Sequence, residues 1–91
     1  MSELYELVSF VNRGKIRKGT LIELRRPHTP TELADILMAH RSSVSRAVLA
    51  LEKRGLVKCI TPDEKVCRYY QISDEGSRVL AEIKNLEKKI E

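Results

Sequence analysis

The chain has 91 residues, a length that suits one small domain and excludes a two-domain enzyme or a doubly wound nucleotide-binding fold. It carries 17 Lys and Arg against 13 Asp and Glu, a net charge of +4, and its pI is near 9.3. Such a balance favours a polyanionic partner, most often nucleic acid. Because apolar runs are short and the acidic N-terminus lacks a cleavage pattern, we expect a cytoplasmic protein without membrane contact.

Positive charge is concentrated in the middle of the chain. Residues 13–68 hold 13 basic and 6 acidic side chains, a net charge of +7, whereas residues 1–12 carry −2 and residues 69–91 carry −1. The central segment is therefore the candidate surface for a polyanion.

Two helices are expected before Pro27. The first has an apolar stripe at helical spacing, formed by Leu4, Leu7, Val8 and Val11, and Gly14 can end it. The second is expected over residues 15–26, although Gly19 weakens it by about 1 kcal/mol relative to Ala. Its buried residues would be Ile16, Leu21 and Leu24.

The next two helices are expected to form a helix-turn-helix. Thr29-Pro30-Thr31-Glu32 is a capping box with Pro at the first helical position, and the helix it opens would end near Met38. Its predicted buried stripe is Leu33, Ile36 and Leu37. A second helix is expected over residues 41–54, closed by Gly55. Its core-facing residues would be Val44, Ala47, Val48 and Leu51. Two short helices joined by so tight a turn are typical of this motif.

The hydrophobic period changes after the second helix of the motif. Residues 56–60 and 66–72 are rich in β-branched and aromatic side chains and predict a hairpin with its turn at residues 61–65. Residues 73–75 then begin a last helix, since Ser is followed by two acidic residues. Its apolar seam is spaced 4, 3 and 4 residues apart: Val79, Ile83, Leu86 and Ile90.

The two cysteines fall in opposite strands of the predicted hairpin. If the register pairs Cys59 with Cys67, three roles stay open: reduced thiols, a redox-sensitive bridge, or part of a metal site with a histidine. Two thiolates and His28 or His40 would still need a fourth ligand for structural zinc, so no metal or cofactor is expected.

The order of these elements and the segments LADILMAHRSSVSRAVLALEKRGLV and YYQISDEG resemble the winged helix-turn-helix of MarR- and ArsR-type transcriptional regulators, including small archaeal members. The resemblance covers roughly residues 15–80. It implies a mainly α fold with a small β-hairpin wing, an α+β architecture, and a regulator rather than an enzyme. We expect one domain over residues 1–91, with an N-terminal helix (1–14), the helix-turn-helix and wing (15–76) and a C-terminal dimerisation helix (77–91).

In this motif the second helix enters the major groove, and its N-terminal residues reach base edges. Arginine can contact guanine at two atoms, and serine hydroxyls can donate to or accept from several bases. The predicted DNA-reading residues are Arg41, Ser42, Ser43, Ser45 and Arg46. An ordinary solvated helix face is the alternative. Leu49 also projects outward, where it either touches a thymine methyl group or packs on a neighbour.

Phosphate contacts are expected from the wing and from the start of the third helix, and they would position the protein without reading sequence. The predicted residues are Thr31, Lys58, Lys65 and Arg68. For Thr31, simple capping is at least as good an interpretation.

Apolar stripes at both ends of the chain predict a homodimer. The residues assigned to it are Leu4, Leu7, Val79, Ile83, Leu86 and Ile90. The predicted function is sequence-specific binding of double-stranded DNA as a homodimer that regulates transcription. We expect it to act as a repressor. The alternatives are a non-specific architectural DNA-binding protein and a winged-helix module for protein–protein assembly. The sequence points to no particular small-molecule effector.

Overall fold

The computed structural model describes the backbone of residues 2–90 and the side-chain surroundings of residues 3–88. Within this part of the chain, five helices enclose one core and a two-stranded antiparallel sheet follows the fourth helix. The elements are α1 (Ser2–Arg13), α2 (Lys15–Glu23), α3 (Pro30–Leu37), α4 (Arg41–Lys53), β1 (Val57–Cys59), β2 (Tyr70–Ile72) and α5 (Asp74–Ile90). The predicted fold class is confirmed.

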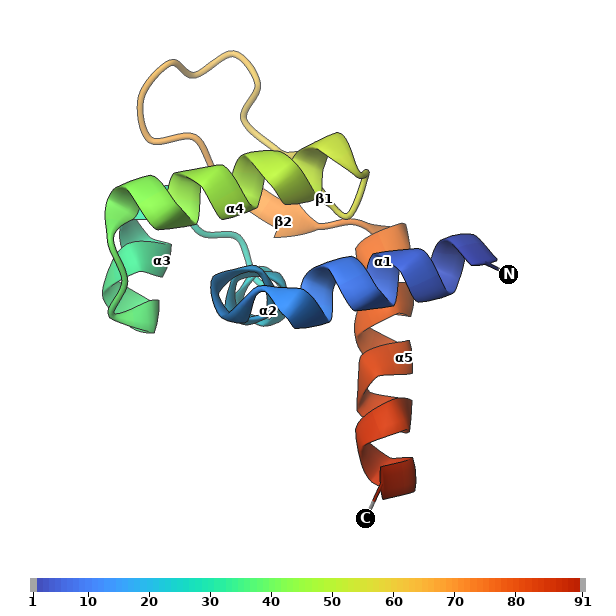
Figure 1. The fold of residues 1–91 in the computed structure, drawn as a ribbon. Helices are drawn as coiled ribbons and strands as arrows, with labels where there is room; N and C mark the ends of the chain where they lie inside the picture. Colours follow the sequence, from blue (N-terminus) through green and yellow to red (C-terminus); the bar gives the residue numbers. More distant parts are fainter. Residues whose placement is uncertain (1, 91) are drawn as a thin grey trace.

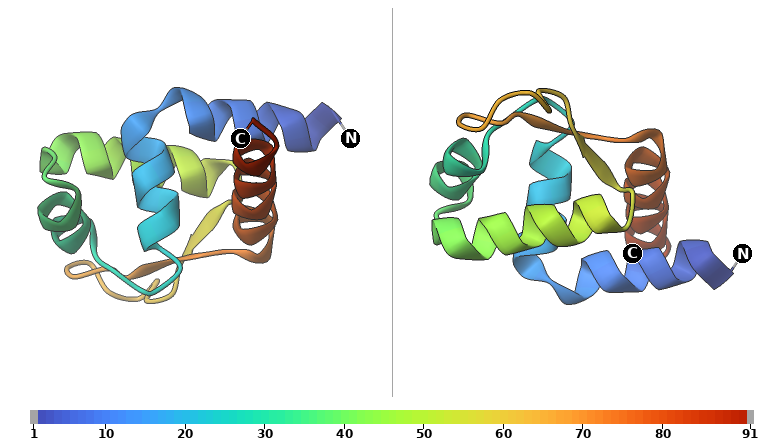
Figure 2. Two further views of the ribbon diagram at one scale, coloured as in Figure 1. Left: turned by 90° about the horizontal axis from the view of Figure 1, so that it is seen from below. Right: turned by 90° about the horizontal axis from the view of Figure 1, so that it is seen from above.

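The helix-turn-helix and the flanking helices occupy different ends of the molecule. Helix α4 and the loop between the strands lie at the top of Figure 1, whereas α5 points away from them. Both views of Figure 2 place α3 at one end and α5 with the N-terminal half of α1 at the other. The core between them contains fully buried side chains from each helix: Val11, Leu21, Leu33, Val44, Leu51 and Ile83. A surface on α4 is therefore separated in space from a surface on α5.

Local signals set the start of α3 as predicted. The Thr29 hydroxyl accepts a hydrogen bond from the Glu32 backbone N–H (3.1 Å), and the Glu32 carboxylate accepts one from the Thr29 N–H (2.9 Å). The helix ends at Leu37, and its C-cap Met38 adopts the left-handed conformation with φ 53°. One predicted core residue is wrong: Ile36 is 46% exposed, and Ala34 is buried beside Leu33 instead.

Helix α2 is shorter than predicted, because it ends at Glu23 rather than near residue 26. Leu24 follows it as the C-cap, and its carbonyl accepts a hydrogen bond from the Ile72 N–H of β2 (2.7 Å). His28 then pairs with Tyr70 through two backbone hydrogen bonds, so the segment between α2 and α3 runs beside β2.

The hairpin is also shorter than predicted, and its register separates the two cysteines. Cys59 faces Tyr70 across the sheet, whereas Cys67 lies in the long loop with φ 58°. The register therefore does not pair Cys59 with Cys67, and both are free thiols. The base of the loop is closed by the Thr61 hydroxyl, which accepts a hydrogen bond from the Tyr69 N–H (2.9 Å) in place of further strand pairing. We call residues 60–69 the wing loop.

The start of α5 is fixed to the end of α4. The Ser73 hydroxyl accepts a hydrogen bond from the Gly76 N–H (3.0 Å) and donates one to the Gly55 carbonyl (2.6 Å). Gly76 is buried against the backbone of Leu56, where a Cβ atom would lie 2.1 Å from the carbonyl oxygen. Further along α5, the ammonium of Lys18 pairs with the Glu87 carboxylate at 2.5 Å.

Replacing Gly76 with Ala tests this packing. Ala normally stabilises a helix by about 1 kcal/mol relative to Gly, but here the new methyl group would overlap the Leu56 carbonyl. We expect Gly76→Ala to lower the free energy of unfolding by about 1–3 kcal/mol in urea titrations. The exposed neighbour provides the control, since Ser77→Ala should change it by less than about 0.5 kcal/mol. A stabilised Gly76→Ala variant would contradict this packing.

Candidate nucleic-acid interface

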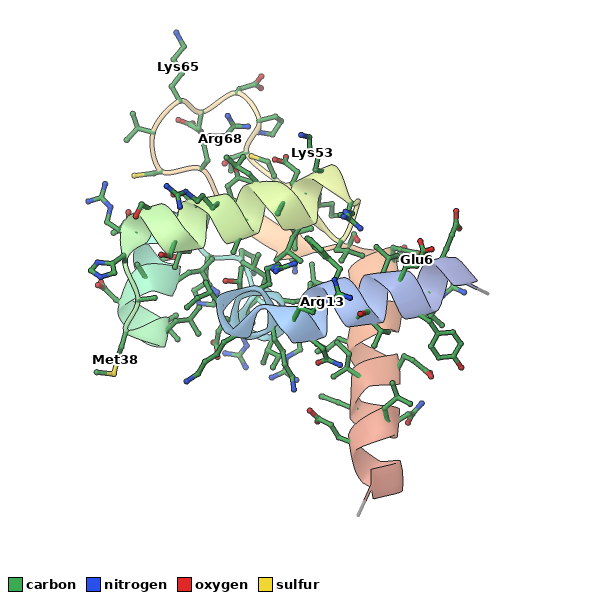
Figure 3. The ribbon with its side chains drawn as sticks, in the orientation of Figure 1. Glu6, Arg13, Met38, Lys53, Lys65 and Arg68 are labelled. Carbon is green, nitrogen blue, oxygen red and sulfur yellow. The ribbon has the colours of Figure 1, made fainter. Side chains whose placement is uncertain are left out.

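Burial of one side of α4 decides which side faces solvent. Val44, Ala47, Val48 and Leu51 are buried, as predicted. Helix α4 packs against α2 and α3 through this face. Ser42, Arg46 and Lys53 are exposed on the opposite side. Figure 3 shows Lys53 rising from α4 on the same side as Lys65 at the end of the wing loop.

One groove runs along α4 on the side of the wing loop. It is about 470 Å³ in volume and lies between the start of α3, the start of α4 and the wing loop. Five of the predicted DNA-contacting residues line it: Thr31, Arg41, Ser45, Lys65 and Arg68. Three cationic side chains and two hydroxyls from three separate segments are thus brought together. The groove also contains the Glu32 carboxylate, which accepts a hydrogen bond from the Thr29 N–H, and its excess of positive charge suits a phosphate backbone.

A second groove lies on the opposite flank of α4, against the start of α2. It is about 390 Å³ in volume, and Lys15, Arg17, Ser43 and Arg46 supply its polar side chains. Lys15 and Arg17 were not among the residues predicted from the sequence to form the interface. The packing of α2 on α4 brings Lys15 and Arg17 into this groove, and a contact between two helices cannot be predicted from a local sequence pattern.

Two predicted residues lie outside both grooves. Ser42 is exposed on the outer side of α4, between the two flanks. Lys58 is exposed on β1, where it faces Gln71 in the sheet. The predicted set is therefore divided between the two flanks and the outer side of α4, with Lys58 on the sheet.

Arg68 contacts a thiol at the base of the wing loop. Its Nε–H donates a hydrogen bond to the Cys59 Sγ at 3.4 Å. Burial alone raises the pKa of the Cys59 thiol, but the hydrogen bonds from Arg68 and Thr61 and the charge of Arg68 lower it by more. The pKa of Cys59 consequently lies below its ordinary value. The contact also holds the Arg68 side chain against the sheet.

A stacked aromatic ring supports the other end of the interface. The guanidinium carbons of Arg17 and Arg54 lie 4.3 and 4.1 Å from the centroid of the Phe10 ring. Arg17 also donates a hydrogen bond to the Phe10 carbonyl (2.7 Å). This stack joins α1 to the start of α2 and the end of α4, so the position of α1 is coupled to that of α4.

The residues predicted to form a dimer differ in their accessibility. Val79 and Ile83 are 0% and 1% exposed, because α5 packs them against the protomer's own core. Leu4, Leu7 and Leu86 are half-buried and border that core. The side chain of Ile90 lies outside the described residues. A partner could thus contact only the second group directly, while Val79 and Ile83 hold α5 in place.

The described part of the chain offers neither a metal-ligand cluster nor a membrane-spanning helix. Among the described residues, His, Cys, Asp and Glu side chains do not gather in groups of three or more that could hold a metal ion. Within the same part of the chain, each helix is too short or too polar to cross a bilayer.

The comparison with protein families decides the kind of helix-turn-helix. Residues 20–60 match the MarR family. The matched segment contains α3, α4 and β1, and thus the helix-turn-helix, whereas the wing-loop residues of the first groove and Lys15 and Arg17 of the second lie outside it. The MarR resemblance inferred from the sequence is thereby confirmed. Members of this family are transcription regulators, which agrees with the expectation that the chain is not an enzyme.

Solved structures share the fold of this chain. The transcriptional regulator BldR from Sulfolobus solfataricus is 22% identical, with a TM-score of 0.75 over 98% of this chain and 66% of BldR. The oxidised form of MarR from E. coli is 18% identical, with a TM-score of 0.72 over 93% of this chain and 62% of MarR. The ST1889 protein from Sulfolobus tokodaii is 25% identical, with a TM-score of 0.59 over 85% of this chain and 79% of ST1889.

The chain spans less than two thirds of several of these structures, including 64% of a MarR family transcription regulator, SP03579. No curated protein matches the sequence. Because the matched structures cover 94% and 98% of this chain, the MarR-type winged-helix fold extends beyond residues 20–60 to nearly the whole chain.

The contact between Arg68 and Cys59 predicts a pH-dependent reactivity. Only the thiolate is alkylated, and the Arg68 guanidinium stabilises it. In a Cys67→Ser background, we expect the midpoint of the iodoacetamide rate against pH to lie below that of an unperturbed cysteine thiol, because the pKa of Cys59 is lowered. Arg68→Gln should move this midpoint to higher pH.

Lys65→Gln is the control for that experiment, since it removes a charge of the wing loop without touching the thiol. Stopped-flow measurement of the alkylation rate at about ten pH values between 5 and 10 gives the midpoint of each variant, so that the midpoints can be compared. A midpoint that Arg68→Gln leaves unchanged would contradict the assigned contact.

Proposed function

We propose that the chain binds double-stranded DNA through α4 and the wing loop, as a homodimer, and regulates transcription by repression. The observation that carries this proposal is the exposed side of α4 between two cationic grooves. Alongside it, the MarR match supports regulation.

The dimensions of α4 suit the major groove. Thirteen residues give a helix of about 20 Å, and a single helix fits a groove about 12 Å wide. With Ser42 and Arg46 toward the bases, the groove at Lys65 and Arg68 would face one phosphate backbone and the groove at Lys15 the other. In this placement Arg41, Ser43 and Ser45 line the flanking grooves beside the base-facing residues, and Lys58 lies outside both grooves.

Two alternatives are distinguished by binding behaviour. An architectural protein would use the same cationic side chains but bind duplexes regardless of sequence. An assembly module would bind no DNA. Ser42 and Arg46, both exposed on α4, favour sequence reading, because these groups match hydrogen-bonding atoms on base edges.

A homodimer would place two copies of α4 against one two-fold symmetric operator. Helix α5 and the N-terminal half of α1 lie at the end of the molecule away from α3, so contact there leaves both grooves free. The half-buried Leu4, Leu7 and Leu86 supply apolar surface at this end. The proposal includes the division of the chain into an N-terminal helix, a helix-turn-helix with wing, and a C-terminal dimerisation helix. It also includes a cytoplasmic location.

Selection from random duplexes at two salt concentrations tests DNA binding and specificity together. We expect a palindromic sequence to be enriched. On the selected duplex, Arg46→Ala should weaken binding by about 1–3 kcal/mol, since a base contact is lost. Lys65→Gln should weaken binding to all duplexes and reduce the slope of log K against log salt by about 1.

Lys84→Gln is the matched control, because Lys84 is exposed on α5 away from both grooves. Enrichment of no sequence, with salt-dependent binding retained, would favour the architectural alternative. Absence of salt-dependent binding would favour the assembly module.

Sedimentation velocity tests the homodimer. Leu4→Gln combined with Leu86→Gln should give the monomer mass and weaker operator binding, since both changes put polar groups on the proposed contact surface. Circular dichroism should show that the variant stays helical. The exposed Ile36→Gln on α3 is the control and should leave the mass unchanged. A wild-type protein that sediments as a monomer would contradict the homodimer.

A further inference from the structure

Leu49 is the exposed apolar residue on the outer side of α4. Its side chain is 58% exposed, whereas Val44, Val48 and Leu51 of the same helix are 1% exposed or less. Leu49, Ala50, Glu52 and Lys53 line a shallow, mainly apolar hollow of about 590 Å³ on this part of the surface. A large apolar side chain is therefore exposed to solvent within the proposed DNA-binding surface.

The charges around Leu49 decide what could cover it. Arg46 and Lys53 are exposed on the same side of α4, one turn before and one turn after it. The carboxylate that lines the same hollow, Glu52, is half-buried, so the exposed charge beside Leu49 is positive. A second copy of α4 packed on Leu49 would bring these cations close to their counterparts, and like charges at close range oppose association. A polyanion is attracted by the same charges. The surroundings of Leu49 therefore favour nucleic acid over a second copy of this chain.

Duplex DNA offers an apolar group in the major groove. The C5-methyl group of thymine projects there, and apolar side chains recognise it by contact. We propose that Leu49 determines specificity by packing against the C5-methyl group of a thymine in the operator. The inference rests on the proposed function, because it requires α4 to lie in the major groove.

The spacing along α4 indicates which base pair is involved. Leu49 lies three residues after Arg46, a rise of about 4.5 Å along the helix axis. Successive base pairs of one strand are about 3.4 Å apart. With α4 lying lengthwise in the groove, Leu49 meets a base pair next to the one that Arg46 contacts.

Single substitution of deoxyuridine for each thymine of the selected duplex isolates this contact, since it removes only the methyl group. We expect the wild-type protein to lose affinity about fourfold at one thymine per half-site, the factor given by burial of about one methylene-sized group. That thymine should lie beside the base pair at which Arg46→Ala relaxes specificity. Leu49→Ala should lose a similar factor on the thymine duplex and show no further loss at that uracil.

Met38→Ala is the matched control, because Met38 is 93% exposed and points away from the wing-loop side of the molecule (Figure 3). It should retain both the affinity and the thymine dependence of the wild type. Equal losses for Leu49→Ala on thymine and uracil duplexes would overturn the inference, as would a wild-type protein indifferent to every uracil. If those results came with intact salt-dependent binding and an effect of Arg46→Ala, the proposed function would survive without the thymine contact. Absence of salt-dependent binding would overturn both.

Discussion

Anchoring of α4 by its buried face is the constraint on which the interface depends. Val44, Val48 and Leu51 are almost fully enclosed, so rotation of the helix would take apolar surface out of the core. This fixes the side on which Arg46 and the serines face solvent. It also fixes Leu49 there, at the cost of leaving an apolar side chain exposed. The charged and hydroxyl groups of α4 thus already face solvent before a ligand binds, and binding requires no rotation of the helix.

The elements that flank α4 are tied to its two ends. Ser73 hydrogen-bonds Gly55 directly after α4 and also caps α5, so α4 and α5 meet at one junction. On the other side of the end of α4, Arg54 stacks on Phe10 of α1. Both helices proposed to form the dimer therefore contact the end of α4. A change in how two protomers pack would reach α4 through these contacts, which relates dimerisation to DNA binding in physical terms.

Local sequence signals predicted much of the fold, and tertiary contacts account for what was missed. The capping box at Thr29 and the glycine after α4 act through neighbouring backbone groups, so sequence spacing was sufficient to locate them. The register of the hairpin was not readable, because the Thr61 hydroxyl closes the wing loop where strand pairing was expected. Lys15 was missed because only the packing of α2 on α4 brings it beside Arg46. The amphipathic seam of α5 was read correctly as apolar, but Ile83 belongs to the protomer's own core.

Backbone amide chemical shifts during titration with the selected duplex test the central claim most directly. In a 10.4 kDa chain each amide of α4, the wing loop and α5 can be followed separately. The account predicts that the largest changes fall on residues 41–53 and 60–69, with smaller ones near Lys15, and that the outer surface of α5 changes little. Changes confined to α5 and α1, with α4 unaffected at saturation, would contradict it.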